Sequence, residues 1–226
     1  MAFKAFKKNL IIIVSAIFIF SLIPTVSVLA VANKNKPVIT LDAGHGGYDG
    51  GVTGLDSKVK ESVINLELVR LIKGYLESDG YKVVLTRKDD SALGDTKQKD
   101  MKKRIEIINS SNCILMISIH VNFYPSRYRR GIQTFFNKSV DEELAKSIQS
   151  DLNHALNFPA LNRNFSALWG DYYILANCKC PATIIETGFI SNPEDEKQLL
   201  SERYRMLLAY QIFCGIKKYL ATDISV

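Results

Sequence analysis

The stretch that decides the fold reads Ile39-Thr40-Leu41-Asp42-Ala43-Gly44-His45-Gly46-Gly47. Residues 38–41 are a short apolar run, which is typical of a buried strand. The run ends in glycines, which let the backbone turn sharply and approach closely whatever the loop holds. In an open α/β sheet, ligands bind at the loops that follow the carboxyl ends of the strands. We therefore expect His45 to face a binding site.

Two of the three histidines, His45 and His120, follow apolar runs of this kind. Residues 113–119 are continuously apolar, which indicates a strand buried on both faces. We predict that His45 and His120 meet over one sheet and bind a metal ion. A single histidine after a strand is also compatible with an ordinary hydrogen-bonded structural role. The third histidine, His154, falls on a predicted helix and is expected at the surface.

The rest of the chain alternates strand patterns with helix patterns. Helical spacing of apolar residues covers residues 62–78, 101–109, 140–156 and 202–220. Further strands are expected at residues 81–86, 113–119, 131–136, 172–175 and 182–185. This alternation predicts a single α/β domain, with a mostly parallel, twisted sheet of about six strands flanked by helices on both faces.

The beginning of the chain indicates export. Residues 9–32 carry no charge and follow three lysines within the first eight residues. We expect a signal peptide or N-terminal membrane anchor over residues 1–32, a linker over 33–37, and one catalytic domain over 38–221. An uncleaved leader would hold the protein at the membrane. The net charge of +6 falls to +3 without the three lysines of the leader, which is too small to indicate a nucleic-acid partner.

The cysteine pattern indicates no cysteine metal site, and it leaves open whether a disulfide forms in an exported protein. The four cysteines form no CxxC pair and no zinc-ribbon spacing: Cys113, Cys178, Cys180 and Cys214.

A catalytic zinc site needs three protein ligands and an open position, so two histidines require a third partner. Glu61 is the candidate, because it lies where the glycine-rich loop runs into the first predicted helix. The same residue is also explained by the helix dipole, which favours acids in the first turn.

A second acid, Glu186, ends the apolar run that begins at residue 182. A buried carboxylate without a partner is costly. Glu186 could act as a general base on a water molecule at the metal, or form an ion pair with an arginine.

Four motifs, in this order, resemble the zinc-dependent N-acetylmuramoyl-L-alanine amidases of the amidase-3 family. They are Asp42-Ala43-Gly44-His45-Gly46-Gly47, then Lys60-Glu61 with Asn65-Leu66, then Ser118-Ile119-His120-Val121-Asn122, then Glu186-Thr187-Gly188-Phe189-Ile190-Ser191-Asn192. Lesser matches are Arg87 after the second strand, Arg104 on the second helix, and Pro181 before the last core strand. The resemblance covers residues 38–220.

The resemblance implies one Zn²⁺ per chain, held by His45, Glu61 and His120, with Glu186 as the catalytic carboxylate. It implies that peptidoglycan is the substrate, cleaved between the lactyl group of N-acetylmuramic acid and the first L-alanine of the stem peptide. We also expect Arg87, Asn122 and Arg127 to bind substrate. Arginine suits the carboxylates of the stem peptide, although Arg127 fits a solvated loop equally well.

The compact domain without wall-binding repeats resembles the spore-cortex, germination-specific amidases, which would place its action at the cell wall or spore cortex. Residues 121–130 are few and include Pro125, so we expect no helix there to cover the site. Control would then come from timing, compartment or an accessory protein. Two alternatives stay open: another exported zinc hydrolase, such as a peptidase or deacetylase, and a non-catalytic peptidoglycan-binding relative.

Overall fold

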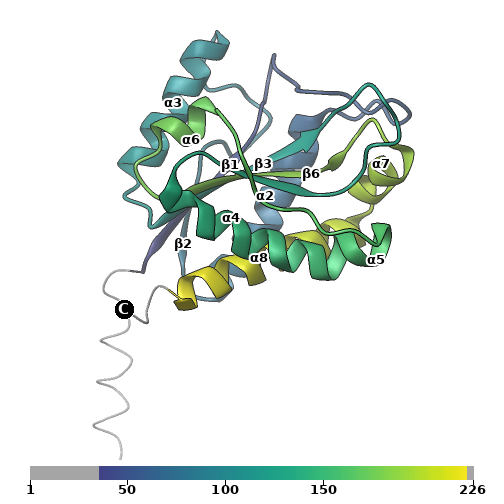
Figure 1. Cartoon of the computed structure of the whole chain (residues 1–226). Helices are drawn as coiled ribbons and strands as arrows, with labels where there is room; N and C mark the ends of the chain where they lie inside the picture. Colours follow the sequence, from purple (N-terminus) through teal and green to yellow (C-terminus); the bar gives the residue numbers. More distant parts are fainter. Residues whose placement is uncertain (1–35, 223–226) are drawn as a thin grey trace, which may run out of the picture. The chain divides into compact units, whose positions relative to one another are not determined.

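A computed structural model describes residues 36–222, so the predicted leader and residues 33–35 of the linker lie outside the described residues. The described chain forms a six-stranded sheet in the order β2-β1-β3-β6-β4-β5 (Figure 1). The strands are β1 (Val38–Ala43), β2 (Lys82–Leu85), β3 (Leu115–Asn122), β4 (Gln133–Phe136), β5 (Leu168–Trp169) and β6 (Ala182–Phe189). The helices are α2 (Glu61–Ser78), α3 (Lys97–Ser110), α4 (Ser139–Leu152), the π-helical turn η1 (Asn153–Asn157), α5 (Phe158–Leu161), α6 (Tyr173–Asn177), α7 (Pro193–Leu200) and α8 (Glu202–Thr222).

The sheet is mostly parallel, as predicted. Strand β1 runs parallel to β2 and β3, and β3 runs parallel to β6. Strand β4 is antiparallel to β6, while the short β5 is parallel to β4. The carboxyl ends of β1, β3 and β6 therefore meet at one edge of the sheet.

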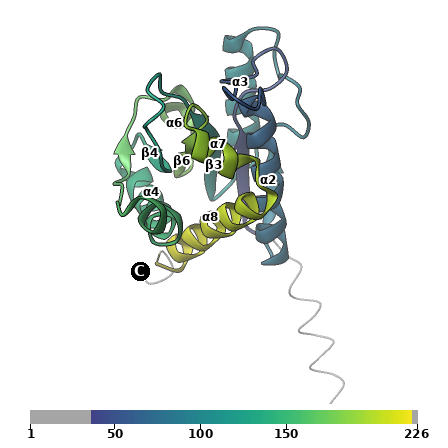
Figure 2. The same cartoon turned by 90° about the vertical axis from the view of Figure 1, so that its right-hand side faces the viewer.

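Helices cover both faces of the sheet, which confirms the predicted fold class. The larger core lies under α2, α4 and α8, and Figure 2 shows α8 lying between the other two. Alternate residues of β3, such as Ile117 and Ile119, point into this core. The smaller core lies under α3 and α6, where Ile108 and Ile174 pack on Met116 and Ile184 of the sheet. None of the helices within residues 36–222 is long and apolar enough to cross a membrane.

The prediction of a strand over residues 172–175 is wrong. Tyr172 caps helix α6, and the next three residues form its first part. Ile174 and Leu175 are both buried, although they are adjacent. In a strand they would point to opposite faces, whereas one turn of helix lets both face the core.

Several helix boundaries differ from those expected. Helix α3 begins at Lys97, four residues before the predicted start, with the Thr96 side chain accepting a hydrogen bond from the Lys99 amide. Helix α7 was not predicted, although its start carries standard signals. The Asn192 side chain accepts hydrogen bonds from two backbone amides and Pro193 follows it, which together favour a helix start.

Candidate active site

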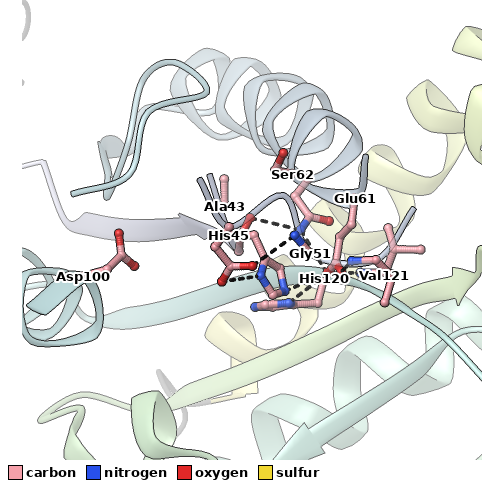
Figure 3. Close-up of polar contacts among 12 residues, drawn as sticks. Ala43, His45, Gly51, Glu61, Ser62, Asp100, His120 and Val121 are labelled. Atoms are coloured by element: carbon pink, nitrogen blue, oxygen red, sulfur yellow. Dashed lines mark hydrogen bonds and ion pairs between the residues drawn. The ribbon is translucent and has the colours of Figure 1, made fainter. Parts of the chain in front are cut away.

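Three side chains that are distant in the sequence meet at the carboxyl edge of the sheet (Figure 3). His45 lies on the loop after β1, Glu61 is the first residue of α2, and His120 lies near the end of β3. Their potential metal-binding atoms all lie within 4.8 Å of one another. The two imidazole rings are 4.9 Å apart, centre to centre. The structure thus brings His45 and His120 together, with Glu61 beside them, as the sequence predicted.

One carboxylate oxygen, Oε1 of Glu61, is crowded by nitrogen atoms. It lies 3.0 Å from His120 Nδ1 and 3.4 Å from His45 Nε2. It also accepts hydrogen bonds from the Val121 amide at 2.9 Å and from Asn65 Nδ2 at 3.3 Å. Four nitrogen partners exceed the lone pairs of one oxygen. A cation bound by the two imidazole nitrogens and this oxygen would relieve the crowding.

The charges around the cluster favour an anionic Glu61. Burial raises the pKa of the Glu61 carboxyl, but hydrogen bonds with His120 and His45 outweigh burial and hold that pKa well below its usual range. Burial lowers the pKa of His45, but its pairing with Glu61 and Asp49 raises it overall to about 9. Without a metal ion, positive charge on an imidazole therefore stabilises the carboxylate.

The loop that carries His45 is held by two buried arginines. Arg104 donates to the carbonyl of Ala43 at 2.7 Å and to that of His45 at 2.6 Å. Arg87 donates to the carbonyls of Ala43 and Gly44 at 2.8 and 3.0 Å. His45 has a φ of +61°, a left-handed conformation that residues with a Cβ rarely adopt. The two guanidinium groups hold the backbone around this residue in place.

The sequence had led us to expect that Arg87 binds substrate. The structure instead places its guanidinium group against the backbone of the loop. The residue is only 3% exposed. Its remaining donors also go to backbone carbonyls, those of Ser62 and Asp89. Because Ala43, Gly44 and Ser62 lie far from Arg87 in the chain, this role was not visible in the sequence pattern.

Two glycines let the three side chains approach one another. A Cβ atom on Gly44 would lie 2.2 Å from Cε1 of His120. A Cβ atom on Gly51 would lie 2.5 Å from Oε2 of Glu61 and 2.8 Å from the His45 ring. All three distances are far below van der Waals contact, so these positions require glycine.

Glu186 faces the same edge from the neighbouring strand. It pairs in register with His120 across β3 and β6. Burial raises the pKa of Glu186 to about 7, with the His120 charge acting in the opposite direction. Its buried Oε2 has no hydrogen-bond partner within residues 36–222, and no arginine of that range forms an ion pair with it. The predicted alternative, an ion pair with arginine, is therefore not what the structure shows.

Asp49 is a site residue that the sequence analysis missed. Its Oδ2 lies 2.9 Å from Nδ1 of His45. A carboxylate at this nitrogen favours the tautomer that leaves Nε2 free, and Nε2 is the atom that faces Glu61. The signal in the sequence was an acid four residues after His45, within the glycine-rich loop.

One cavity adjoins the cluster, and a second lies further along β3 and β4. One, of about 190 Å³, is bounded by His45 and His120 and by α6 on its far side. The other has a volume of about 660 Å³ and is lined at one end by Asn122 and Gln133. Gln133 is opposite Glu186 across β4 and β6. The other lining residues of this cavity are mostly aromatic, apolar or basic: Tyr128, Arg129, Arg130, Gly131, Phe135, Leu161, Arg163, Phe165, Leu168 and Phe189.

Of the other expected substrate-binding residues, Asn122 lines the larger cavity and Arg127 does not. Arg127 is exposed and forms an ion pair with Asp56 at 2.8 Å. The third histidine, His154, lies in η1 and is not part of the cluster.

The site is open to solvent, as predicted. No helix forms in residues 121–130. The side chains of His45 and His120 remain 22% and 23% exposed, so α6 forms a wall of the neighbouring cavity and does not cover the rings.

Comparison with known proteins agrees with this geometry. Residues 39–218 match the family model described as amidase_3, N-acetylmuramoyl-L-alanine amidase. A germination-specific N-acetylmuramoyl-L-alanine amidase of Bacillus subtilis is 34% identical over 192 residues, covering 80% of this chain and 79% of the relative.

Solved structures show the same likeness. The CwlD amidase from Clostridioides difficile, in complex with the GerS lipoprotein, is 36% identical with a TM-score of 0.77, over 84% of this chain and all of that one. An N-acetylmuramoyl-L-alanine amidase from Clostridium difficile 630 is 26% identical with a TM-score of 0.76, over the same shares. The family model covers nearly the whole described domain, and the chain belongs to the amidase_3 family of N-acetylmuramoyl-L-alanine amidases.

Proposed function

We propose that this amidase cleaves the bond between the lactyl group of N-acetylmuramic acid and L-alanine with one Zn²⁺ held by His45, Glu61 and His120. The observation that carries the proposal is the convergence of two imidazoles on one carboxylate oxygen. Two neutral imidazoles and one carboxylate are a common ligand set for hydrolytic zinc. When bound, zinc lowers the pKa of water to about 7 and polarises a carbonyl group.

The donor set fits zinc better than it fits a purely structural role. The three groups leave part of each imidazole facing solvent, so a water molecule and a substrate carbonyl can reach the site. Asp49 orients His45, and the Val121 amide and Asn65 orient Glu61. Groups of this kind, which hold the ligands from behind, are typical of zinc sites.

Glu186 is the proposed general base and acid. It lies beside His120 in the sheet, and its Oε2 has no partner among residues 36–222. Its pKa is about 7, raised by burial, so the group can take and return a proton near neutral pH. In this role Glu186 accepts the proton of the attacking water and passes it to the amide nitrogen that leaves.

The larger cavity is the proposed binding groove for the stem peptide. One of its lining residues is Gln133, the neighbour of Glu186 across β4 and β6, and it contains Arg129 and Arg163, neither of which forms an ion pair within residues 36–222. Arg129 instead lies over Tyr124, at 4.2 Å from the ring centre. Guanidinium groups suit carboxylates, which a stem peptide supplies. We assign this role to Asn122, Arg129 and Arg163, whereas Arg127 is engaged by Asp56.

We also propose that the protein is exported and acts at the cell wall or spore cortex with an accessory protein. The support is its likeness to a germination-specific amidase and to an amidase that was solved with a lipoprotein. The apolar segment at residues 9–32 would serve as the export signal or the anchor.

Mass spectrometry of purified peptidoglycan, digested with and without a chelator, tests the proposal. We expect free N-terminal L-alanine, intact N-acetylated muramic acid, and no products when the metal is removed. A peptidase would instead cut within the stem peptide, and a deacetylase would release acetate and leave the stem attached. Binding to peptidoglycan with no product under any metal condition would indicate the non-catalytic alternative.

A further inference from the structure

Three of the four cysteines gather at the amino ends of β3 and β6, away from the proposed zinc site. Cys113 lies just before β3, and Cys178 and Cys180 lie between α6 and β6. The sulfur atoms of Cys113 and Cys180 are 3.0 Å apart, and those of Cys178 and Cys180 are 3.4 Å apart. Their spacing in the sequence had left the possibility of a disulfide open and had not indicated which cysteines would pair.

We propose that Cys113 and Cys180 form a disulfide that links the amino ends of β3 and β6, while Cys178 remains a thiol. The backbone is already joined at this point, because the Met116 amide donates to the Pro181 carbonyl at 2.9 Å and Met116 is opposite Ala182. The alternative pair, Cys178 and Cys180, would close a small ring around one residue and has the longer separation.

The chemistry favours Cys113 as the attacking group. Hydrogen bonds from the Cys180 thiol, and from the Ser111 and Thr40 hydroxyls, outweigh burial and lower the pKa of Cys113 to about 6. The thiolate is the nucleophile in disulfide exchange. It attacks one sulfur of an external disulfide, such as oxidised glutathione, and displaces a thiolate. Cys180 then loses its proton, attacks the Cys113 sulfur and displaces the second thiolate, so that the external disulfide takes up the two electrons and two protons.

The link would fix the two strands that carry the active-site residues. His120 and Glu186 are opposite each other further along these strands. The bond would also close a long loop, since its ends are 67 positions apart. A disulfide that closes a loop of this size stabilises the folded state, because it restricts the unfolded chain. We therefore expect the melting temperature to rise by roughly 5–15 °C on oxidation.

Peptide mapping of the full chain in detergent tests the proposal. The protein is reduced or treated with oxidised glutathione, and its free thiols are alkylated in denaturant before digestion with trypsin. Cleavage after Lys179 separates Cys178 from Cys180, so the two pairings give different linked peptides. We expect oxidation to join the peptide of Cys113 to the peptide beginning at Cys180, with Cys178 and Cys214 alkylated.

Three serine variants test which cysteines form the disulfide. Cys113→Ser should lose the linked peptide and the rise in melting temperature, whereas Cys178→Ser and the matched control Cys214→Ser should keep both. Full alkylation of Cys113 after oxidation of the wild-type chain would overturn the proposal. A linked pair that includes Cys178 would do the same, and neither result depends on the folding of a variant.

Discussion

At the scale of single residues, the site separates the group proposed to transfer protons from the groups proposed to hold the metal. Glu186 lies one strand away from the cluster of His45, Glu61 and His120, and it has no hydrogen bond with any of the three within the described residues. The two kinds of residue can therefore be tested independently.

Glu186→Gln should slow hydrolysis by roughly a hundredfold or more while zinc stays bound, because the amide keeps the shape but cannot accept the water proton. Rates on purified peptidoglycan and zinc content of the same preparation provide the measurement. Glu194→Gln, an exposed acid on α7, is the matched control and should leave both unchanged. If Glu186→Gln loses its zinc, Glu186 is a ligand and the roles proposed here are wrong.

Gly44→Ala should abolish activity and weaken zinc binding sharply, because the new methyl group would overlap the His120 ring. Gly74→Ala is the control, since a Cβ there meets nothing within 4 Å. That change lies in a helix and should raise stability by roughly 0.5–1 kcal/mol. Zinc titration and thermal melting of both variants decide the matter; normal zinc affinity in Gly44→Ala would show that His120 is free to move.

At the scale of the elements, β1, β2, β3 and α3 are tied together by one buried carboxylate. Asp42 accepts hydrogen bonds from Thr86 on one side and Ser118 on the other, at 2.6 and 2.7 Å. Arg104 of α3 pairs with the same carboxylate at 2.7 Å. A charge pair of this kind, once buried, is strongly destabilising when one partner is removed.

The stability should depend on pH through this carboxylate. Burial raises the pKa of Asp42, but Arg104 and the two hydroxyl groups lower it from 3.8 to about 2. The pKa of Asp42 in the folded protein, about 2, lies below its unfolded value of 3.8. The resulting stabilisation of roughly 2 kcal/mol is therefore complete at pH values above the unfolded pKa, and it is lost as the pH falls through the folded pKa.

Asp42→Asn should therefore lose about 3 kcal/mol of unfolding free energy near neutral pH and show a weaker decline below about pH 4. Urea unfolding at several pH values measures both effects. Asp95→Asn serves as the control, because Asp95 pairs with Lys99 at the exposed surface. Equal pH profiles for wild type and Asp42→Asn would contradict the assignment.

The elements also show what the sequence could and could not reveal. Strands β1, β3 and β6 were predictable because each contains a mostly apolar run, and a residue of the site lies at the end of that run or on the loop after it. Residues 172–175 were misassigned, since a short apolar run does not distinguish a buried strand from one turn of helix. The burial of Arg87 and the meeting of Cys113 with Cys180 depend on contacts between distant segments, which no local pattern encodes.

At the scale of the whole molecule, the described domain should fold without the apolar leader. Strand β1 begins at Val38, and the described residues from Pro37 onward form one compact unit. A chain that begins at Asn33 should be soluble and should melt cooperatively, as measured by circular dichroism. Aggregation of this shorter chain, alongside a folded full chain in detergent, would show that the leader belongs to the core.

The open site leads to an expectation about control. Since no helix of residues 121–130 covers the imidazoles, we expect restraint to come from timing of expression, from compartment or from an accessory protein. We expect the isolated chain to be weakly active and to hold zinc loosely if an accessory protein completes the site. High activity with one firmly bound zinc per isolated chain would remove the need for such a protein.

The two arginines that hold the loop of His45 bear on the stage at which the enzyme becomes active. Because Arg87 and Arg104 donate hydrogen bonds to the backbone of the loop, we expect the loop to form before any ion binds. We expect the protein to be folded but inactive when it reaches the cell wall, and to become active only when it binds a metal ion there. The supply of zinc outside the membrane would then set the rate at which the wall is opened, and a chelator would stop that process reversibly.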